Sequence, residues 1–515
     1  MAAAPMRVIE PFYYLDNFRS MLETLKRRDG DLLAPEESNF IREFFRLPQR
    51  SGALLVRMVM RKGPLFRAGR LVYPEIGDIE EAVRPLTGLQ WVDARPALTV
   101  QDLFALYSKA EVAHYLGLPK HCVRVPKSTL LAGLLDPALD LPQLENWSET
   151  ADTVFRLEVV EMCERLRHMF FGNFRQDWTE FVLSDLGIFK YERICMHGGS
   201  RPFPTRRHVD GFLRLHRCRE MLHTGDDLAQ IELAMPPHML DCEWLEERRE
   251  KLRFQIARAY ERAGECERAS AIYSTCAFPE ARIRAARIGA GGAARRTRHV
   301  APVPSFELNI DKCAEDAPVE YRVRDHLMDE EDEGTSVHYV ENGLVNALFG
   351  LLCWPAVFAP VPGAFFHAFH HGPADLPSAG FVARRKREFA ECLAELESGT
   401  YRRTILRRFG EKHGISSPFV SWGLIDEPLL RAALQCFPAA HLGLWFDWMV
   451  RDLRSNRSGF PDLVQFWPRS RRYRLIEVKA PGDRLQESQR RCFEFLLSHQ
   501  VPVSLCRVRW NATVA

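Results

Sequence analysis

The 515-residue sequence lacks the features of a secreted or membrane protein. It has no uncharged apolar run of the ~20 residues that a membrane helix requires. Residues 1–20 show no basic stretch followed by an apolar core, so no secretory signal is predicted. The thirteen cysteines include no Cys-x-x-Cys pair, so neither a disulfide framework nor a zinc ribbon is implied. We therefore expect a cytoplasmic or nucleoid protein, nuclear in a eukaryote, without membrane contact.

A large net charge is also missing. The 70 basic and 68 acidic residues leave a formal net charge of only +2 at pH 7. Nucleic-acid binding depends on local patches of positive charge, so this total does not decide it. Hydrophobic residues make up 46% of the chain, which is enough for packed cores and too much for a disordered protein. At roughly 100 to 200 residues per domain, we expect a multidomain protein.

Residues 1–95 are predicted to form a helical region with a basic end. Apolar residues recur at three- and four-residue spacing in segments 40–45 and 53–58. Five basic residues then follow within fourteen positions: Arg57, Arg61, Lys62, Arg67 and Arg70. Such a cluster is suited to phosphate contacts with DNA. A solvated helix edge explains the pattern equally well.

Residues 96–150 contain two short helical patterns joined by Gly117-Leu118-Pro119. The arrangement resembles a SAP-type DNA-binding helical hairpin. In that interpretation Lys120, Arg124 and Lys127 would contact phosphates. A plain helical connector is the alternative.

Residues 151–290 are again predicted to be helical. Five residues follow the spacing of one tetratricopeptide-like unit: Ala257, Tyr260, Gly264, Ala269 and Tyr273. We interpret this region as a helical-repeat domain, although a stable solenoid needs about three repeats. Residues 291–335 are expected to be a linker and entry segment, because they follow a Gly/Ala-rich stretch and contain the acidic run 329–333.

The chemistry is concentrated in residues 336–515. Segments 460–467 and 473–479 are predicted to be two strands of a hairpin. Strand side chains alternate between faces, so Glu477 and Lys479 share one face while their neighbours point into the core. Pairing would bring Asp462 beside Glu477, and adjacent carboxylates repel each other unless a cation neutralises them.

Oxygen ligands of this kind favour one or two Mg²⁺ or Mn²⁺ ions. Such ions assist phosphodiester hydrolysis, and Lys479 would orient water or stabilise the developing charge. Gln489 lies among core positions of the helix that follows, so it needs a polar partner, and the metal site is the candidate. An edge position on the helix is the alternative. Asp483 has capping-box spacing to Gln486, and we assign it to a helix cap.

These residues resemble a known nuclease family. Pro461-Asp462 followed by Glu477-x-Lys479 is similar to the PD-(D/E)xK superfamily, and Gly459–Val464 with Gln489 resembles its VRR-NUC domain. Segments 350–354, 420–422 and 451–454 extend the resemblance to the Fanconi-anaemia-associated nuclease family, as a bacterial member. It implies mostly α-helical N-terminal and helical-repeat regions followed by a C-terminal α/β PD-(D/E)xK nuclease domain at 336–515.

The resemblance also implies a larger metal site. Glu341 would complete it, so the expected ligands are Glu341, Asp462, Glu477 and the backbone carbonyl of Val478. The family often has His-x-Glu-Gly at this place, whereas this sequence has Tyr339-Val340-Glu341-Asn342. A lone glutamate at a helix start is otherwise a dipole or capping residue.

Finally, the resemblance implies cleavage of branched or flapped double-stranded DNA near 5′ flaps, with 5′ to 3′ digestion, in interstrand crosslink repair. Basic clusters 384–387 and 407–408 would line the DNA path or form solvated helix faces. One alternative is an inactive branched-DNA scaffold, against which the intact acidic pair and lysine argue. Another is a Holliday-junction-resolving or restriction-type nuclease. Whether the protein is a homodimer stays open.

Overall fold

The computed structural model describes residues 10–61, 63–118, 124–134, 152–196, 199–289, 303–310, 318–329 and 335–511. The chain divides into two compact units. The first comprises Met1–Ile188 with Pro202–Leu213, and the second comprises Phe189–Arg201 with Arg214–Ala515. Within the described ranges, no helix is long and apolar enough to cross a membrane.

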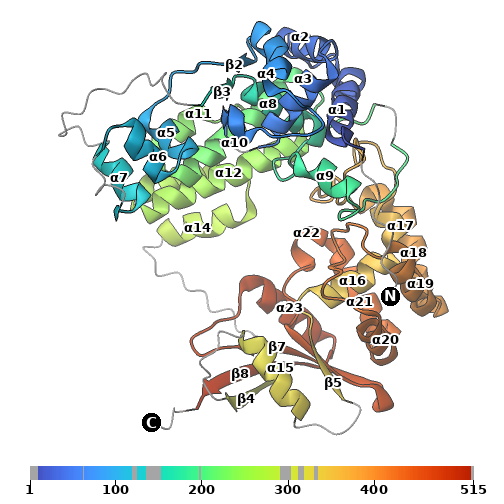
Figure 1. The fold of residues 1–515 in the computed structure, drawn as a ribbon. Coiled ribbons are helices and arrows are strands. Elements are labelled where there is room, and N and C mark those ends of the chain that lie inside the picture. The colour runs from blue at the N-terminus through green and yellow to red at the C-terminus, as the bar shows by residue number, and fades with distance from the viewer. Residues whose placement is uncertain are drawn as a thin grey trace. The chain divides into compact units, whose positions relative to one another are not determined.

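The first unit is built on the predicted N-terminal helices (Figure 1). These are α1 (Tyr13–Asp29), α2 (Pro35–Phe44), α3 (Gln49–Val59) and α4 (Ile79–Gly88). Two later helices, α8 (Val160–Phe171) and α9 (Thr179–Asp185), also pack against α1. The rings of Phe18 and Trp178 lie 5.3 Å apart there. We expected residues 152–188 in the helical-repeat domain; they belong to the N-terminal unit because their apolar faces complete its core.

A small sheet in this unit was not predicted. The described residues form strands β1 (Leu65–Arg67), β2 (Val92–Asp93) and β3 (Val154–Leu157), in the order β1-β3-β2. Both β1 and β2 pair antiparallel with β3, which comes from beyond the SAP-like segment. Strands of two to four residues are too short to show a periodic pattern, so local sequence could not reveal them.

The SAP-like segment contains α5 (Val100–Leu106), α6 (Lys109–Tyr115) and α7 (Lys127–Leu134). The first predicted helix is thus two helices, because Ser108 ends the helical run and caps α6 by exchanging hydrogen bonds with Glu111. Buried apolar residues such as Leu103 and Leu130 hold the segment together. Lys120 lies outside the described residues.

The helices of the predicted repeat region are α10 (Arg206–Thr224), α11 (Leu228–Ala234), α12 (Glu243–Arg262), α13 (Cys266–Thr275) and α14 (Pro279–Gly289). The predicted tetratricopeptide-like unit spans α12 and α13, which pack on each other. Ala257 and Ala269 are fully buried at this contact. Gly264 makes the turn with φ +84°, a conformation that glycine adopts without strain.

The nuclease region contains a five-stranded sheet of described residues in the order β4-β8-β7-β6-β5. Its strands are β4 (Ser305–Ile310), β5 (Ser336–Tyr339), β6 (Leu463–Trp467), β7 (Arg472–Lys479) and β8 (Val503–Trp510). The predicted antiparallel hairpin is confirmed as β6 and β7, with Leu463 opposite Ile476. From β7 the chain passes through α23 (Glu487–Ser498) to β8, which runs parallel to β7.

The prediction of a linker at 291–335 was wrong in part. Residues 305–310 form β4 at the edge of the nuclease sheet, and α15 (Val319–Asp329) packs on the sheet (Figure 1). Val323 of α15 is fully buried against Ile476 and Val478. Strand β4 joins the sheet by pairing with β8, which lies about 200 residues later in the chain. A local sequence pattern does not show such a distant pairing, so the strand was not predicted. Residues 290–302, 311–317 and 330–334 lie outside the described residues.

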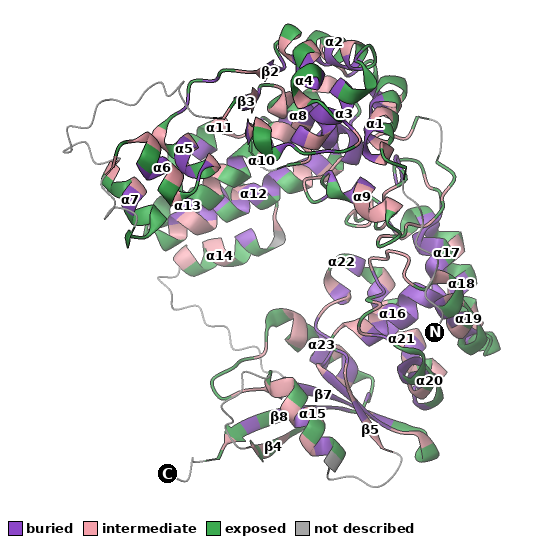
Figure 2. Ribbon diagram, in the orientation of Figure 1, coloured by how far each residue is buried: buried purple, intermediate pink, exposed green. Residues whose placement is uncertain are grey.

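Helices cover the opposite face of the sheet (Figure 2). Of these, α20 (Glu427–Cys436) packs on β6 and α23 packs on β8. The other helices extend the same core: α16 (Gly343–Leu352), α17 (Trp354–Val357), α18 (Lys386–Ser398), α19 (Tyr401–Lys412), α21 (Ala439–Arg451) and α22 (Leu453–Asn456). Their core includes Phe349, Trp445 and Phe493 and contacts Leu475 of β7. The predicted alternation along β7 is confirmed, since Leu475 and Ile476 belong to different cores. The prediction had one core, whereas helices pack on both faces of the strand.

One of the basic clusters has an internal role. The Arg385 side chain is fully buried and makes two hydrogen bonds to the Asp375 carboxylate, at 2.7 and 2.9 Å. Arg384 donates to the same carboxylate at 2.7 Å. A buried guanidinium needs such a partner, so Arg385 is held inside the helical layer and is not free to line a DNA path. Arg384 shares this carboxylate but is itself exposed.

Candidate active site

Asp462 connects the nuclease hairpin to the segment before α16. We expected Asp462 within the strand at 460–467, but the strand β6 starts one residue later, at Leu463. Its carboxylate oxygen Oδ2 accepts the backbone N–H of Val478 at 2.9 Å. Its backbone carbonyl accepts the N–H groups of Val340 at 2.8 Å and Glu341 at 2.9 Å. Asp462 is therefore fixed by main-chain contacts on both sides.

Glu477 is the buried centre of the site. Its side chain has no solvent exposure, and its Oε1 atom lies 2.6 Å from the Lys479 ammonium. The Gln489 amide also donates to Oε1. Within the described part of the chain, Oε2 has no hydrogen-bond partner. A buried carboxylate oxygen without a partner is costly, and a bound cation would satisfy it.

The two carboxyl groups have raised pKa values. Burial raises the pKa of Glu477 from 4.5 to about 7, and the nearby charge of Asp462 adds to the shift. Burial likewise raises the pKa of Asp462 from 3.8 to about 6, which the Val478 hydrogen bond and Lys479 partly offset. Both groups therefore resist ionisation without a cation, as expected for adjacent buried carboxylates.

Gln489 contacts the site from α23, as we expected. Its amide nitrogen reaches Glu477, and its oxygen accepts the N–H of Gln486 at 2.9 Å. The cap of α23 is thus the Gln486–Gln489 pair, and the prediction of a cap at Asp483 was wrong. Asp483 is exposed in the preceding turn, where its N–H bonds to the carbonyl of Ala480, and the helix starts only at Glu487.

A glycine allows α23 to approach the hairpin. Gly459 has φ +94°, and a Cβ atom there would lie only 2.5 Å from the carbonyl oxygen of Ser488. No larger residue fits that contact without moving the start of α23. The glycine of the Gly459–Val464 motif therefore allows Gln489 to reach Glu477.

Glu341 lies beside Asp462, between β5 and α16. Its backbone has φ +37°, which is unusual for a residue with a side chain, and its N–H bonds to the Asp462 carbonyl. Its exposed carboxylate accepts the Tyr339 hydroxyl at 2.9 Å. Its negative charge also raises the pKa of Asp462. The structure thus brings together Glu341, Asp462, Glu477, Lys479 and Gln489.

Sequence reasoning missed one further acidic residue near this site. Glu320 lies in the first turn of α15, and its charge contributes to the raised pKa values of both Asp462 and Glu477. The signal for it was the helical spacing of Val319, Val323 and Leu327, which indicates a helix with one apolar face. That spacing does not say which sheet the helix covers.

The donor atoms suit a hard divalent cation. The three carboxylates offer only oxygen, which Mg²⁺ and Mn²⁺ prefer, and Oε2 of Glu477 is available to bind one. Val478 donates its N–H to Asp462, and its carbonyl as a further ligand stays a prediction. The residues therefore fit a divalent metal.

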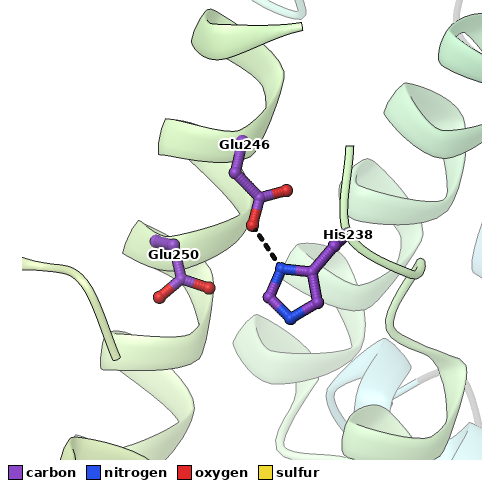
Figure 3. A group of neighbouring side chains, drawn as sticks. All are labelled: His238, Glu246 and Glu250. Carbon is purple, nitrogen blue, oxygen red and sulfur yellow. Dashed lines mark hydrogen bonds and ion pairs between the residues drawn. The ribbon is translucent and has the colours of Figure 1, made fainter. Parts of the chain in front are cut away.

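A second cluster of possible metal ligands has a different character (Figure 3). His238, Glu246 and Glu250 lie close together, with His238 Nδ1 2.7 Å from a Glu246 oxygen. However, Nη1 of Arg249 lies 3.2 Å from His238, 3.2 Å from Glu246 and 2.8 Å from Glu250. A guanidinium already supplies the positive charge, so this cluster is a structural ion-pair network.

The basic residues of the N-terminal unit differ in whether they form internal ion pairs or are exposed to solvent. Arg57 forms an ion pair with Glu75 at 2.7 Å and lies over the Tyr14 ring. Arg67 pairs with Glu111 and Asp152, and its side chain is only 12% exposed. These internal contacts argue against phosphate binding by either arginine. Arg61, Arg70, Arg124 and Lys127 are exposed, whereas Lys62 lies outside the described residues.

Comparisons with known proteins agree with this arrangement. Residues 396–510 match the VRR-NUC domain, and residues 12–93 match the FAN1 HTH domain. A Fanconi-associated nuclease 1 homolog from Pseudomonas aeruginosa is 44% identical, over 98% of this chain and 96% of its own. A homolog from Arabidopsis thaliana is 22% identical over 96% of this chain and 67% of its own.

Solved structures give the same result. A crystal structure of paFAN1 bound to 5′-flap DNA with a 2-nucleotide flap and a gap superposes with a TM-score of 0.89 at 43% identity. The match covers 99% of this chain and 100% of that one. The chain therefore belongs to the Fanconi-associated nuclease 1 family of structure-specific nucleases that depend on a divalent metal.

Proposed function

We propose that the protein cleaves 5′-flapped duplex DNA using Mg²⁺ or Mn²⁺ held by Glu341, Asp462 and Glu477. One observation carries this proposal. The fully buried Glu477 has an unpartnered oxygen among the described residues and lies beside Asp462, and both pKa values are raised. Such a pair is costly to keep in a protein unless a cation uses it.

A divalent cation bound there would polarise the scissile phosphodiester and lower the pKa of an attacking water. The chain's own residues prepare the site. Gln489 and Lys479 hold Oε1 of Glu477, which leaves Oε2 free to bind the cation. Lys479 also places a positive charge beside the acidic pair, where it can orient water or stabilise charge on the phosphate.

The choice of substrate is supported by the paFAN1 complexes, which contain flaps of one and two nucleotides. We propose the same substrate class here, with 5′ to 3′ digestion and a role in interstrand crosslink repair. Residues 1–95 and the SAP-like segment 96–150 would contact duplex arms, and the helical-repeat region would connect them to the nuclease. The nuclease domain, proposed as 336–515, is extended by β4 and α15.

A substrate panel tests this function. End-labelled 5′-flap, 3′-flap and plain duplex DNA are incubated with the protein and Mg²⁺, Mn²⁺ or a chelator. We expect cleavage near the 5′-flap junction at a rate at least about tenfold above that of the 3′ flap, and none with chelator. Binding of the flap without cleavage under any metal condition would favour the scaffold interpretation. Equal cutting of all substrates would favour a restriction-type enzyme.

The DNA contacts of the first unit give a separate prediction. Replacing Arg61 and Arg70 together with alanine should weaken binding to flap and plain duplex alike, because both substrates offer the same duplex phosphates. The slope of log affinity against log salt should fall by about 1.8, from roughly 0.9 per lost contact. Fluorescence anisotropy at several salt concentrations measures both.

The control for this experiment removes two exposed arginines elsewhere, Arg268 and Arg431, which pair with Glu265 and Glu427. This double variant has the same change in net charge. A salt slope that falls equally in both double variants would contradict a specific role for Arg61 and Arg70.

A further inference from the structure

The main chain around Glu341 is fixed, but its side chain is exposed. The N–H groups of Val340 and Glu341 both bond to the carbonyl of Asp462, which holds the segment against the hairpin. A free glutamate side chain on the surface has considerable rotational entropy, which a metal ligand loses on binding. A contact that holds the carboxylate before the metal arrives reduces this loss.

Tyr339 makes such a contact. It is the last residue of β5, and its hydroxyl donates to Oε2 of Glu341 at 2.9 Å. The amide of Asn342 lies 3.4 Å from the other oxygen, Oε1, and is therefore a weaker restraint. An ionised carboxylate has about four acceptor positions, so one bond from a tyrosine leaves others for a cation.

The Tyr339 ring is itself held in place. It packs against the core cluster formed by Val323, Ile476 and Val478. The Tyr321 ring of α15 lies 5.1 Å from it at an interplanar angle of 32°. This packing restricts the Tyr339 ring and gives its hydroxyl a defined position from which to direct the Glu341 carboxylate.

We propose that Tyr339 is a positioning residue that orients Glu341 for metal binding through its hydroxyl group. The proposal rests on the proposed function, because it assumes that Glu341 is a metal ligand. Residues that hold a ligand in this way commonly change metal affinity by about 10- to 100-fold when they are lost. Tyr339 does not contact the reacting atoms, so its loss should affect metal affinity more than the rate with metal bound.

Mn²⁺ binding to the full chain without DNA tests the proposal. Isothermal titration calorimetry compares wild type with Tyr339→Phe, which keeps the ring and removes only the hydroxyl. We expect Tyr339→Phe to weaken Mn²⁺ binding about tenfold. The Mn²⁺ concentration for half-maximal flap cleavage should rise by the same factor, while the rate at saturating Mn²⁺ stays within about twofold.

A double-mutant cycle separates positioning from a general structural effect. In a Glu341→Gln background, the additional change Tyr339→Phe should alter Mn²⁺ affinity by less than about twofold. Glutamine can still accept the Tyr339 hydroxyl, but it no longer offers a charged oxygen for Tyr339 to position. The matched control is Tyr401→Phe, which removes a buried hydroxyl without a hydrogen-bond partner among the described residues. It should leave Mn²⁺ affinity unchanged. The melting temperature in chelator, measured for every variant, detects misfolding.

The outcomes distinguish the two proposals. If wild type binds Mn²⁺ and Glu341→Gln weakens binding but Tyr339→Phe does not, the role of Tyr339 is overturned while the nuclease function stands. The same conclusion follows if Tyr339→Phe weakens Mn²⁺ binding as much in the Glu341→Gln background as it does in wild type. If wild type neither binds Mn²⁺ nor cleaves flaps, the proposed function fails and the role of Tyr339 fails with it.

Discussion

Replacing Asp462 with alanine should lower the rate of flap cleavage by roughly 1,000-fold or more while leaving flap binding intact. The carboxylate combines two tasks, since it accepts the N–H of Val478 and lies beside Glu477 and Glu341. Losing a metal ligand removes several kcal/mol of charge stabilisation, and each 1.36 kcal/mol corresponds to about tenfold in rate. Single-turnover cleavage of a labelled 5′ flap in Mn²⁺ measures the rate, and anisotropy measures binding.

The matched control is Asp483→Ala, which removes an exposed carboxylate from the same motif region. Because Asp483 neither caps α23 nor contacts the acidic pair in the structure, this variant should keep the wild-type rate within about threefold. Cleavage at the wild-type rate by Asp462→Ala would show that the active site lies elsewhere. An equal loss in both variants would show that the effect is not specific to Asp462.

Replacing Glu477 with glutamine should abolish cleavage. It should also increase the free energy of unfolding of the metal-free protein at high pH. The folded-state pKa of about 7 lies above the ordinary value of 4.5, so the folded state holds this proton to higher pH than the unfolded state does. The contribution of Glu477 to the free energy of unfolding is therefore fully present below about pH 4.5 and is lost as the pH rises through about 7. Glutamine has no charge to bury, so the variant avoids this loss.

Urea unfolding in the presence of a chelator measures this effect. At pH 8 the variant should be more stable than wild type by on the order of 1 to 3 kcal/mol, and the difference should shrink towards zero near pH 5. With saturating Mn²⁺ at pH 8, wild type should become more stable than Glu477→Gln, because Mn²⁺ binds the wild-type site more tightly. The exposed Glu307 on β4 provides the control Glu307→Gln, for which we expect no such pH dependence. A less stable variant at pH 8 in chelator would contradict the idea that this buried charge is unfavourable.

The central residues of the candidate site lie close together in the sequence. Asp462, Glu477 and Lys479 lie within eighteen residues on a single hairpin, so strand alternation and turn signals were enough to place them together. The contact of Gln489 followed in the same way, from an inward-facing polar residue on the next helix. The cap was misplaced at Asp483 because several residues before a helix can satisfy its first N–H groups, and only the geometry selects Gln486.

Other features depended on contacts between distant parts of the chain. Strand β4 pairs with β8 about 200 residues later, so residues 305–310 and 319–329 lie in a predicted linker but form a strand and a helix of the nuclease region. The position of α15 in turn brings Glu320 into range of the acidic pair and Tyr321 onto Tyr339.

The sequence by itself therefore placed Asp462, Glu477, Lys479 and Gln489 together, because these residues are neighbours on one hairpin and one helix. Glu341, which is distant in the chain, was added by the family resemblance. The tertiary structure decided what surrounds that chemistry. It decided which carboxylates are buried, which basic residues pair internally and which hydroxyl holds Glu341. These depend on packing between segments that are far apart in the chain, and no local spacing records such contacts.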